Sequence, residues 1–495
     1  MNVLHRTARN VSIVAVSQLI MWLATLGFTV AQASLLGPAR FGQLSLALSY
    51  ALFLSVVIDF GLGIQLSRMV AQRTGGPDAL GATILARVVL WLVALPCLWL
   101  VTVLLGYERE LQLSILVLAL SVLFVGIATS IEAYLRGQEE FTLPSVAAIA
   151  YRVAAAAVGV TVLLLRPDIV GVAGAFLLGS ITYLVVLVIG SRSRLGLEPR
   201  LEARLAVRLM RSAVPLGLWW VIGTFAFSVD MVIVERLLPD ENVGWYAAAY
   251  RLFVVATIVP TLVVGTVLSP VLSRLSLGPR DELRTLLDKA LTALIVSGVA
   301  IGLVLGLFAD RIVATLYPAD AYAPAANALR LLAPRVVFLY VNSVLMYTLV
   351  ALHQDRRLLR TVITLAILNP LANLVAIPLL AQNGAALVSS LTELGWLVWQ
   401  VRAMPNDLLG SASLRVAAKA GVAAVSAAVA CAAVWGQPLV VMLLLALAAY
   451  VGVALLLRIV EPSDLRALRG LISLPRAAAP DLARSVAATA QEKVA

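Results

Sequence analysis

The feature that most constrains this chain is the recurrence of apolar segments long enough to cross a lipid bilayer. A helix needs about 20 mainly apolar residues to span the hydrocarbon core. Hydrophobic residues make up 62% of the 495 residues, and charged residues only 13%, about half the charge of a typical soluble domain. The sequence also lacks the short alternating segments of a membrane β-barrel. We therefore expect an all-α integral membrane protein.

About fourteen segments meet the length needed to span the bilayer. They are expected at 11–33, 43–66, 81–105, 111–135, 142–165, 169–190, 212–237, 245–271, 286–308, 326–350, 359–380, 385–402, 417–434 and 439–459. This spacing predicts two parallel six-helix bundles, followed by a helix pair. The first bundle is expected at 1–190 and the second at 212–402, with a cytoplasmic linker at 191–211 between them. The helix pair is expected at 403–459 and a cytoplasmic tail at 460–495.

The 37 Lys and Arg residues are divided unevenly between the two sets of loops. Short loops rich in Lys and Arg stay in the cytoplasm. The poorer set of loops holds only Arg40, Arg109, Arg166, Arg236 and Arg311. We therefore place both termini on the cytoplasmic side of the membrane. The same sorting accounts for the net charge of +11 without a nucleic-acid partner.

The two predicted bundles show internal similarity at corresponding loops. Leu36-Gly37-Pro38-Ala39-Arg40-Phe41-Gly42 precedes the second segment, and Leu238-Pro239-Asp240-Glu241-Asn242-Val243-Gly244 precedes the eighth. Gly42 and Gly244 are 202 positions apart, as are Ala47 and Ala249. An even number of helices per unit makes such a repeat parallel, and transporters commonly bind substrate between repeated halves.

Five arginines fall inside the apolar segments. A charge at the bilayer centre costs at least about 2.5–3.5 kcal/mol, so each needs a partner, a polar cavity or a route to the interface. They are Arg87, Arg152, Arg251, Arg330 and Arg335, against the membrane acids Asp59, Asp230 and Glu393. The excess of positive charge favours an anion, and guanidinium groups bind phosphate and pyrophosphate bidentately.

Depth separates these five arginines into two groups. Arg152 and Arg335 lie nearest the middle of their segments, so we expect them to contribute most to a pyrophosphate site, helped by Arg251 and Arg330. Arg87 and Arg330 are shallow enough to reach an interface by extending their side chains. The acids Asp59, Asp230 and Glu393 are candidates for ion coupling or for locking one conformation through an arginine pair.

A polar stripe follows one face of the first segment, and a shorter one follows the seventh. Residues spaced by three and four share a helical face. The stripes consist of Gln18, Trp22, Thr25, Thr29 and Gln32, and of Trp220, Thr224 and Ser228. Such stripes either join helices through hydrogen bonds or line a cavity in which hydroxyl, amide and aromatic groups contact sugars; both interpretations remain open.

The sequence offers no catalytic, metal or cofactor site. The only histidines are His5 and His353, and Cys97 and Cys431 lie in separate apolar segments. This excludes a Ser/His/Asp triad and leaves no zinc-ligand spacing. A phosphate-binding P-loop is also missing. We expect a protein that is not an enzyme and that needs no cofactor.

The chain resembles the polysaccharide flippases, the Wzx-type branch of the multidrug/oligosaccharidyl-lipid/polysaccharide exporter superfamily. In the first half the resemblance rests on Arg9-Asn10, Leu36-Gly37-Pro38, Phe41-Gly42 and Asp59-Phe60-Gly61-Leu62. In the second half it rests on Asp230, Val243-Gly244-Trp245-Tyr246 and Ala249-Tyr250-Arg251-Leu252. The order of the segments is similar over nearly the whole chain.

The resemblance implies a flippase that moves an undecaprenyl-pyrophosphate-linked oligosaccharide from the inner to the outer leaflet by alternating access. Its expected partners are this lipid-linked substrate, membrane lipids, a coupling ion (H⁺ or Na⁺) and other polysaccharide-assembly proteins. The main alternative is a multidrug or other lipid-precursor exporter of the same superfamily. A membrane polymerase or glycosyltransferase is disfavoured, because such enzymes usually need a larger outer loop than any here.

Overall fold

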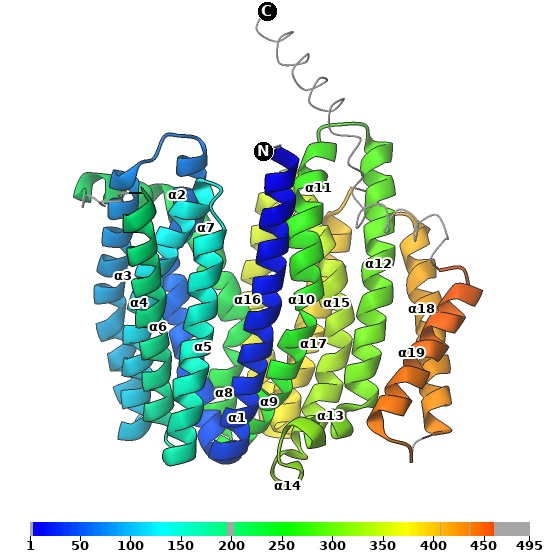
Figure 1. Cartoon of the computed structure of the whole chain (residues 1–495). Helices are drawn as coiled ribbons and strands as arrows, with labels where there is room; N and C mark the ends of the chain where they lie inside the picture. Colours follow the sequence, from blue (N-terminus) through cyan, green and yellow to red (C-terminus); the bar gives the residue numbers. More distant parts are fainter. Residues whose placement is uncertain (1–2, 196–201, 406, 435, 460–495) are drawn as a thin grey trace, which may run out of the picture.

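A computed structural model describes residues 3–195, 202–405, 407–434 and 436–459. All regular secondary structure in this part of the chain is helical. Twelve of its helices are long and apolar enough to cross a membrane. The prediction of an all-α, multi-pass membrane protein is therefore confirmed (Figure 1).

The number of spans differs from the predicted fourteen for two visible reasons. The first two predicted segments form one continuous candidate, Ile20–Asp59. The twelfth predicted segment corresponds to the helix Gln382–Ala403, which is not among the twelve candidates. Fourteen spans therefore remain a prediction.

The first half of the chain forms six helices. They are α1 (Val3–Asp59), α2 (Leu62–Ala71), α3 (Pro77–Leu104), α4 (Arg109–Gly137), α5 (Thr142–Leu165) and α6 (Ile169–Leu195). Helix α1 consists of two helices joined at a sharp bend. Helix α2 follows α1 after Phe60 and Gly61, which both have positive φ angles.

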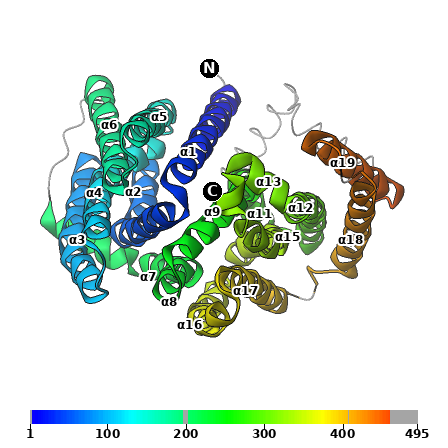
Figure 2. The same ribbon diagram turned by 90° about the horizontal axis from the view of Figure 1, so that it is seen from below.

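The second half is more interrupted. Its helices are α7 (Ala203–Ser228), α8 (Asp230–Leu237), α9 (Asp240–Ala256), α10 (Ile258–Pro260), the π-helix η1 (Thr261–Leu268), α11 (Ser269–Leu275), α12 (Arg280–Leu307), α13 (Ala309–Leu316), α14 (Ala319–Tyr322), α15 (Ala325–Ala351), α16 (Asp355–Leu380) and α17 (Gln382–Ala403). The final pair is α18 (Ser411–Ala432) and α19 (Leu439–Leu456), which lies beside α12 at the edge of the molecule (Figure 2).

The predicted divisions of the chain are only partly visible. Positions 196–201 of the expected linker and the whole expected tail at 460–495 lie outside the described residues. The segment at 212–237 was expected to begin only after the linker, at Ser212. Instead α7 continues from Ala203 to Ser228.

The bend in α1 turns the chain back on itself at one end of the bundle. Gly37 has φ 73° and ψ 172°, a conformation open to glycine but strained for other residues. Pro38 follows, and its fixed φ suits the first turn of the helix that begins there. The two arms of α1 therefore lead from the Gly37 turn back toward the same end of the bundle (Figure 1), and residues of both arms line one pocket.

The two repeated loops meet at this end of the molecule, which we call the Gly42 end. A Cβ on Gly244 would lie 2.0 Å from the carbonyl oxygen of Pro38, and a Cβ on Gly42 would lie 2.4 Å from that of Asp240. Pro38 and Asp240 are themselves 202 positions apart, so the contact is reciprocal. Reciprocity is the property of an interface between units related by a two-fold axis, as the parallel repeat predicts.

Polar contacts surround the glycine pair and join the two halves. Gln43 donates a hydrogen bond to Asp240 (2.7 Å), and the Tyr107 hydroxyl donates one to Glu235 (2.9 Å). The Tyr322 hydroxyl donates to the carbonyl of Ala33 (2.9 Å). Burial and a hydrogen bond with Tyr50 raise the pKa of Tyr107 well above its usual value, so Tyr107 stays protonated and continues to donate.

At the opposite end, the first turns of α7 close against the first half. Leu62, Ala86 and Ala213 belong to one buried apolar cluster shared by α2, α3 and α7. Gln65 donates a hydrogen bond to Ser212 (2.8 Å) beside this cluster. The halves thus meet at both ends, and the space between them is bounded by the arms of α1 and by α9.

Replacing Gly244 by Ala should weaken closure of the Gly42 end, because backbone cannot move aside as a flexible side chain can. Overpacking costs about 1–3 kcal/mol, enough to shift a two-state population roughly fivefold or more. The measurement is labelling of a cavity cysteine (Ser49→Cys, with Cys97→Ser) by an impermeant maleimide. The reagent is applied from the Gly42 side, which the loop charges predict to face outward.

We expect faster labelling in Gly244→Ala than in its parent. Gly27→Ala is the matched control, because a Cβ there meets nothing within 4 Å and should leave labelling unchanged. Equal labelling rates in the two variants would contradict the closing role of the glycine contact.

Candidate functional site

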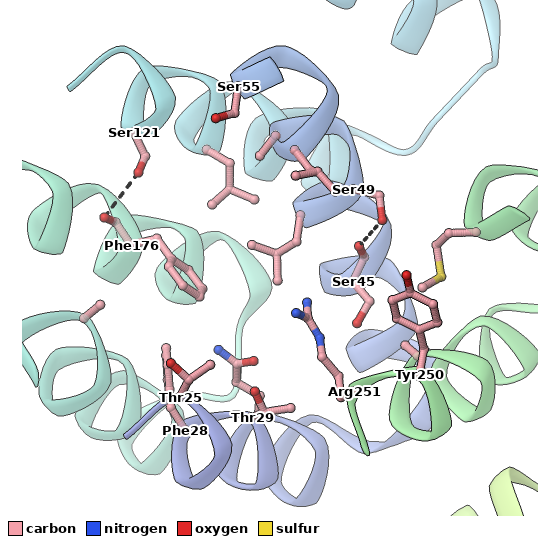
Figure 3. A pocket seen from close by; sticks show the side chains of 18 of the residues that line it. Thr25, Phe28, Thr29, Ser45, Ser49, Ser55, Ser121, Phe176, Tyr250 and Arg251 are labelled. Atoms are coloured by element: carbon pink, nitrogen blue, oxygen red, sulfur yellow. Dashed lines mark hydrogen bonds between the residues drawn. The ribbon is translucent and has the colours of Figure 1, made fainter. Parts of the chain in front are cut away.

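A cavity of about 360 Å³ lies between the two halves. Its walls come from both arms of α1, from α4, α5 and α6 of the first half, and from α7, α8 and α9 of the second. Figure 3 shows the side chains of α1 and α9 converging on this space. Because both halves contribute walls, relative movement of the halves changes the cavity.

Two of the five predicted arginines line this cavity. Arg152 projects from α5 and Arg251 from α9, and both are half-buried. The Arg152 guanidinium lies 5.0 Å from the centre of the Tyr151 ring, a cation–π contact. Among the described residues, no carboxylate forms an ion pair with either arginine. Figure 3 shows Arg251 extended into the space.

The two guanidinium groups repel each other electrostatically. Repulsion between like charges is stronger in a low-dielectric surrounding than in water. An anion bound at both groups would relieve it. This arrangement suits phosphate or diphosphate, whose oxygens accept several charge-assisted hydrogen bonds.

Neutral polar side chains cover the α1 walls. Thr25, Thr29 and Gln32 of the predicted stripe line the cavity from the first arm. The second arm adds Ser45, Ser49 and Ser55. The side-chain nitrogen of Gln32 is buried without a hydrogen-bond partner, so this face of the cavity retains an unsatisfied donor.

The remaining members of the predicted stripes lie outside the cavity wall. Gln18 and Trp22 are partly buried on the α1 arm, beyond Ala24, where the lining begins. Trp220 is 44% exposed and packs edge-on against Trp219. Thr224 is partly buried in α7, whereas Ser228, one turn later, does line the cavity. The stripes extend farther along the helices than the cavity does.

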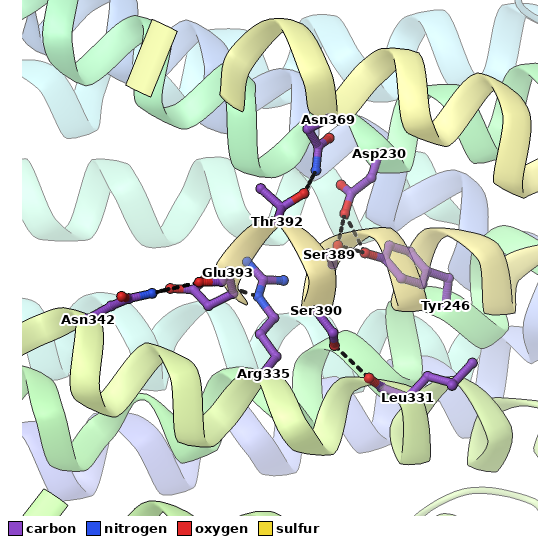
Figure 4. Close-up of polar contacts among 10 residues, drawn as sticks. All are labelled: Asp230, Tyr246, Leu331, Arg335, Asn342, Asn369, Ser389, Ser390, Thr392 and Glu393. Atoms are coloured by element: carbon purple, nitrogen blue, oxygen red, sulfur yellow. Dashed lines mark hydrogen bonds and ion pairs between the residues drawn. The ribbon is translucent and has the colours of Figure 1, made fainter. Parts of the chain in front are cut away.

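Asp230 is the carboxylate that lines the cavity, and its other contacts are all within the second half. Its oxygens accept hydrogen bonds from the Ser389 hydroxyl (3.0 Å), from Tyr246 and from the Met231 backbone (2.9 Å). Close by, Asn369 donates to Thr392 (2.8 Å) (Figure 4). Asp230 therefore connects the cavity to the packing of α8, α9, α16 and α17.

Arg335, expected at the pyrophosphate site, is instead buried beside the cavity. It is 4% exposed and pairs with Glu393 (3.4 Å), whose side chain also accepts a bond from Asn342 (2.8 Å). The Tyr250 and Phe253 rings lie 5.7 and 4.7 Å from its guanidinium. Figure 4 shows this pair between α15 and α17. Since Tyr250 also lines the cavity, it contacts both regions.

The two shallow arginines are also paired within the protein. Arg87 is 1% exposed and forms an ion pair with Asp59. It turns inward and does not extend to the interface. Arg330, near the Gly42 end of α15, is partly exposed and pairs with Asp310 of α13. Neither residue lines the central cavity, so the geometry brings Arg152 and Arg251 together and leaves the other three apart.

Sequence reasoning missed several cavity residues. Ser45 and Ser49 are four residues apart on α1 and therefore share a face, so their spacing carried a signal. Tyr151 and Tyr250 precede the two cavity arginines directly, a repeated Tyr-Arg pair that also could have been noticed. Among the described residues, no group of three or more His, Cys, Asp or Glu side chains is placed to hold a metal ion.

Comparison with known families covers both halves. A family model described as "Polysaccharide biosynthesis protein" matches residues 7–276. A second, described as MatE, matches residues 215–375. No curated protein sequence matches the chain.

Solved structures share the fold at low sequence identity. The lipid II flippase MurJ in an inward closed conformation has a TM-score of 0.75 and 14% identity, over 89% of this chain and 97% of that one. An inward-facing multidrug resistance MATE transporter of the MOP superfamily has a TM-score of 0.60 and 14% identity, over 80% of this chain and 94% of that one. A MOP superfamily transporter from Pyrococcus furiosus, titled for the reverse polarity of its binding pocket, has a TM-score of 0.52 and 17% identity. The match covers 83% of this chain and 95% of that one.

Removing only one partner of the buried Arg335–Glu393 pair should destabilise the protein strongly. An uncompensated buried charge typically costs about 3–5 kcal/mol, whereas replacing both partners by apolar residues is far better tolerated. We expect Arg335→Met to lower the unfolding temperature in detergent, and Arg335→Met with Glu393→Leu to recover much of the loss. A double variant no more stable than the single one would contradict this structural role.

Proposed function

This chain belongs to the polysaccharide biosynthesis protein family, and from that premise we propose that it is a flippase for lipid-linked oligosaccharides. The proposed substrate is an undecaprenyl-pyrophosphate-linked repeat unit, moved from the inner to the outer leaflet of a bacterial cytoplasmic membrane. The loop charges place both termini and the end opposite Gly42 in the cytoplasm.

One observation carries the choice of substrate: Arg152 and Arg251 line the cavity without an acidic partner among the described residues. Within the described part of the chain, the charged side chains on the wall are these two arginines and Asp230, so their net charge is positive. Asp230 already accepts three hydrogen bonds from other groups. The diphosphate of the substrate supplies the missing negative charge.

The uncharged walls suit the sugar next to the diphosphate. Thr25, Thr29 and Gln32 on one arm of α1 face a set of serines on the other, and such groups exchange hydrogen bonds with sugar hydroxyls. Tyr151 and Tyr250 add aromatic rings to the wall. A volume of about 360 Å³ is near the lower end for ligand pockets, which hold about 300–1,000 Å³. It therefore takes the diphosphate and adjacent sugar, while the rest of the glycan and the lipid lie outside.

The reciprocal glycine contact supports alternating access. In this conformation the halves are joined at the Gly42 end by backbone contact and by bonds such as Gln43 to Asp240. Separation of the halves there would open the cavity toward that side. Rocking of repeated halves about a central site is a common transporter mechanism.

The proposed coupling ion, H⁺ or Na⁺, acts at Asp230. This carboxylate faces the cavity on one side and bonds Tyr246 and Ser389 on the other. Neutralising it changes both the charge of the cavity and the bonds that hold α8 against α17. Asp59 and Glu393 are less suited to this role, because each is paired with an arginine outside the cavity.

A multidrug exporter is the second candidate, favoured by the MatE match over 215–375 and by the shared fold. The two candidates require opposite polarity of the cavity. A transporter of organic cations would need a net acidic wall, whereas this wall carries two arginines and one aspartate. The charge balance thus favours the anionic lipid-linked substrate.

Alanine at both Arg152 and Arg251 should abolish export. A hydrogen bond to a charged group contributes about 1.5–3 kcal/mol, so each loss should weaken diphosphate binding roughly tenfold or more. The measurement is surface polysaccharide, together with lipid-linked sugar retained in the membrane, in a deletion strain expressing the variant at normal protein level.

Arg330→Ala is the matched control, since the Arg330 side chain is partly exposed and lies outside the cavity. Its export should stay near that of the parent. Normal export by the Arg152→Ala/Arg251→Ala variant would contradict the proposed binding site, and drug sensitivity without a polysaccharide defect would favour the multidrug alternative.

Asp230→Asn should remove the ion dependence of stability. Ligand that binds only the folded state raises the unfolding temperature. We expect either Na⁺ in place of K⁺, or a lower pH, to raise that temperature in the parent but not in the variant. Ion effects of equal size in both proteins would place the coupling site elsewhere.

A further inference from the structure

A second pocket, of about 530 Å³, lies in the first half, away from the Gly42 end. We call it the inner pocket; it is bounded by the end of α1 at Asp59, by α2, by Arg87 of α3 and by the last turns of α4. It begins one helical turn beyond the central cavity. On α1, Ser55 lines the central cavity and Asp59 lines the inner pocket. On α4, Val125 lines the central cavity and Thr129 lines the inner pocket.

The inner pocket is rich in charge. Arg68, Arg87 and Arg136 lie on its wall with the acids Asp59 and Glu132. Arg136 pairs with Glu132, and its side chain is 53% exposed. Arg68 is exposed and has no hydrogen-bond or ion-pair partner within the described part of the chain. The wall therefore carries one more positive than negative charge, and Arg68 is available to a ligand.

Arg87 is the fixed element of this pocket. One terminal nitrogen bonds the Gly126 carbonyl and the hydroxyls of Thr129 and Ser130 (2.6 and 2.9 Å). The other pairs with Asp59, while Nε is buried without a partner. These bonds to α4 hold the guanidinium in place, so it does not need Asp59 for its position.

The Asp59–Arg87 pair is unequal in exposure. The Arg87 side chain is 1% exposed and the Asp59 side chain 47%. A half-exposed carboxylate loses little when it moves into water, whereas the buried guanidinium requires some anion beside it. Gly63 keeps the approach clear, since a Cβ there would lie 3.0 Å from the Arg87 nitrogen and 3.2 Å from the Asp59 oxygen. Asp59 is therefore the exchangeable partner.

A chain of contacts links the inner pocket to the central cavity. Tyr183 bonds Glu132, and its ring stacks on that of Tyr151, with centroids 5.7 Å apart. Tyr151 in turn lies under the Arg152 guanidinium, 5.0 Å away. One row of packed aromatic side chains thus lies between Glu132 of the inner pocket and Arg152 of the central cavity.

We propose that the inner pocket is a second anion subsite, in which a phosphate group replaces the Asp59 carboxylate on Arg87 and contacts Arg68. The inference rests on the proposed function. A diphosphate-bearing lipid entering from the cytoplasmic leaflet stops here before it reaches Arg152 and Arg251. The phosphate of an ordinary anionic phospholipid has the same chemistry, and the experiment below separates the two sources.

The test is equilibrium binding of inorganic pyrophosphate to the full chain in phosphatidylcholine nanodiscs, in the Arg152→Ala/Arg251→Ala background that disables the central cavity. We expect one pyrophosphate site to remain. Arg68→Ala should weaken it roughly tenfold, and Asp59→Asn should tighten it to a similar extent, because a competing charged partner has been removed. Asp78→Asn makes the same charge change on the exposed start of α3, outside the pocket, and should have no effect.

Unfolding temperatures keep the test informative if Asp59→Asn is unstable. That variant leaves Arg87 without its carboxylate, so pyrophosphate should stabilise it more than the parent. Repeating the binding measurement in nanodiscs of phosphatidylglycerol identifies which molecule supplies the phosphate group at this site. Weaker pyrophosphate binding there assigns the site to a resident lipid headgroup, and unchanged binding assigns it to the diphosphate substrate.

Two results would overturn the subsite. One is loss of all pyrophosphate binding in the Arg152→Ala/Arg251→Ala background, which leaves the proposed function intact. The other is residual binding that is insensitive to Arg68→Ala and Asp59→Asn. Normal polysaccharide export by Arg152→Ala/Arg251→Ala would instead reject the proposed function, whatever the inner pocket binds.

Discussion

The cost of placing a guanidinium inside a membrane organises this molecule. A charged side chain there must find a partner or a polar space. Arg87 and Arg335 meet this requirement through Asp59 and Glu393, and each is almost fully buried. Arg152 and Arg251 meet it only partly, since they share a cavity and no carboxylate pairs with them among the described residues. The unmet requirement is the physical basis for an anionic substrate.

Two backbone features at one end of the molecule shape this cavity: the turn at Gly37 and the close approach of Gly42 and Gly244. Gly37 allows α1 to turn back, so both of its arms line the same space. The reciprocal contact of Gly42 and Gly244 then holds the two halves together below it. The Gly42–Gly244 contact is between backbone groups, whereas the hydrogen bonds from Gln43 to Asp240 and from Tyr107 to Glu235 beside it must break when the halves separate there. The paired arginines stay within single halves and can move with them.

The helices were predictable from the sequence because they depend on local composition and spacing. Spacing also identified Thr25, Thr29 and Gln32 as neighbours on one face, although it could not show where along the stripe the cavity ends. Depth in a segment did not distinguish Arg152 from Arg335. The difference arises from Glu393, which α17 brings beside α15, and such pairing between distant helices is set by tertiary packing that one sequence does not reveal.

The most direct test of this account is a cryo-EM structure of the protein with undecaprenyl diphosphate. The account predicts diphosphate density in the central cavity, in contact with the Arg152 and Arg251 guanidinium groups. Arg335 should remain paired with Glu393 in the same map. Diphosphate density on Arg335, or a central cavity that holds no anion while the lipid binds elsewhere, would contradict it.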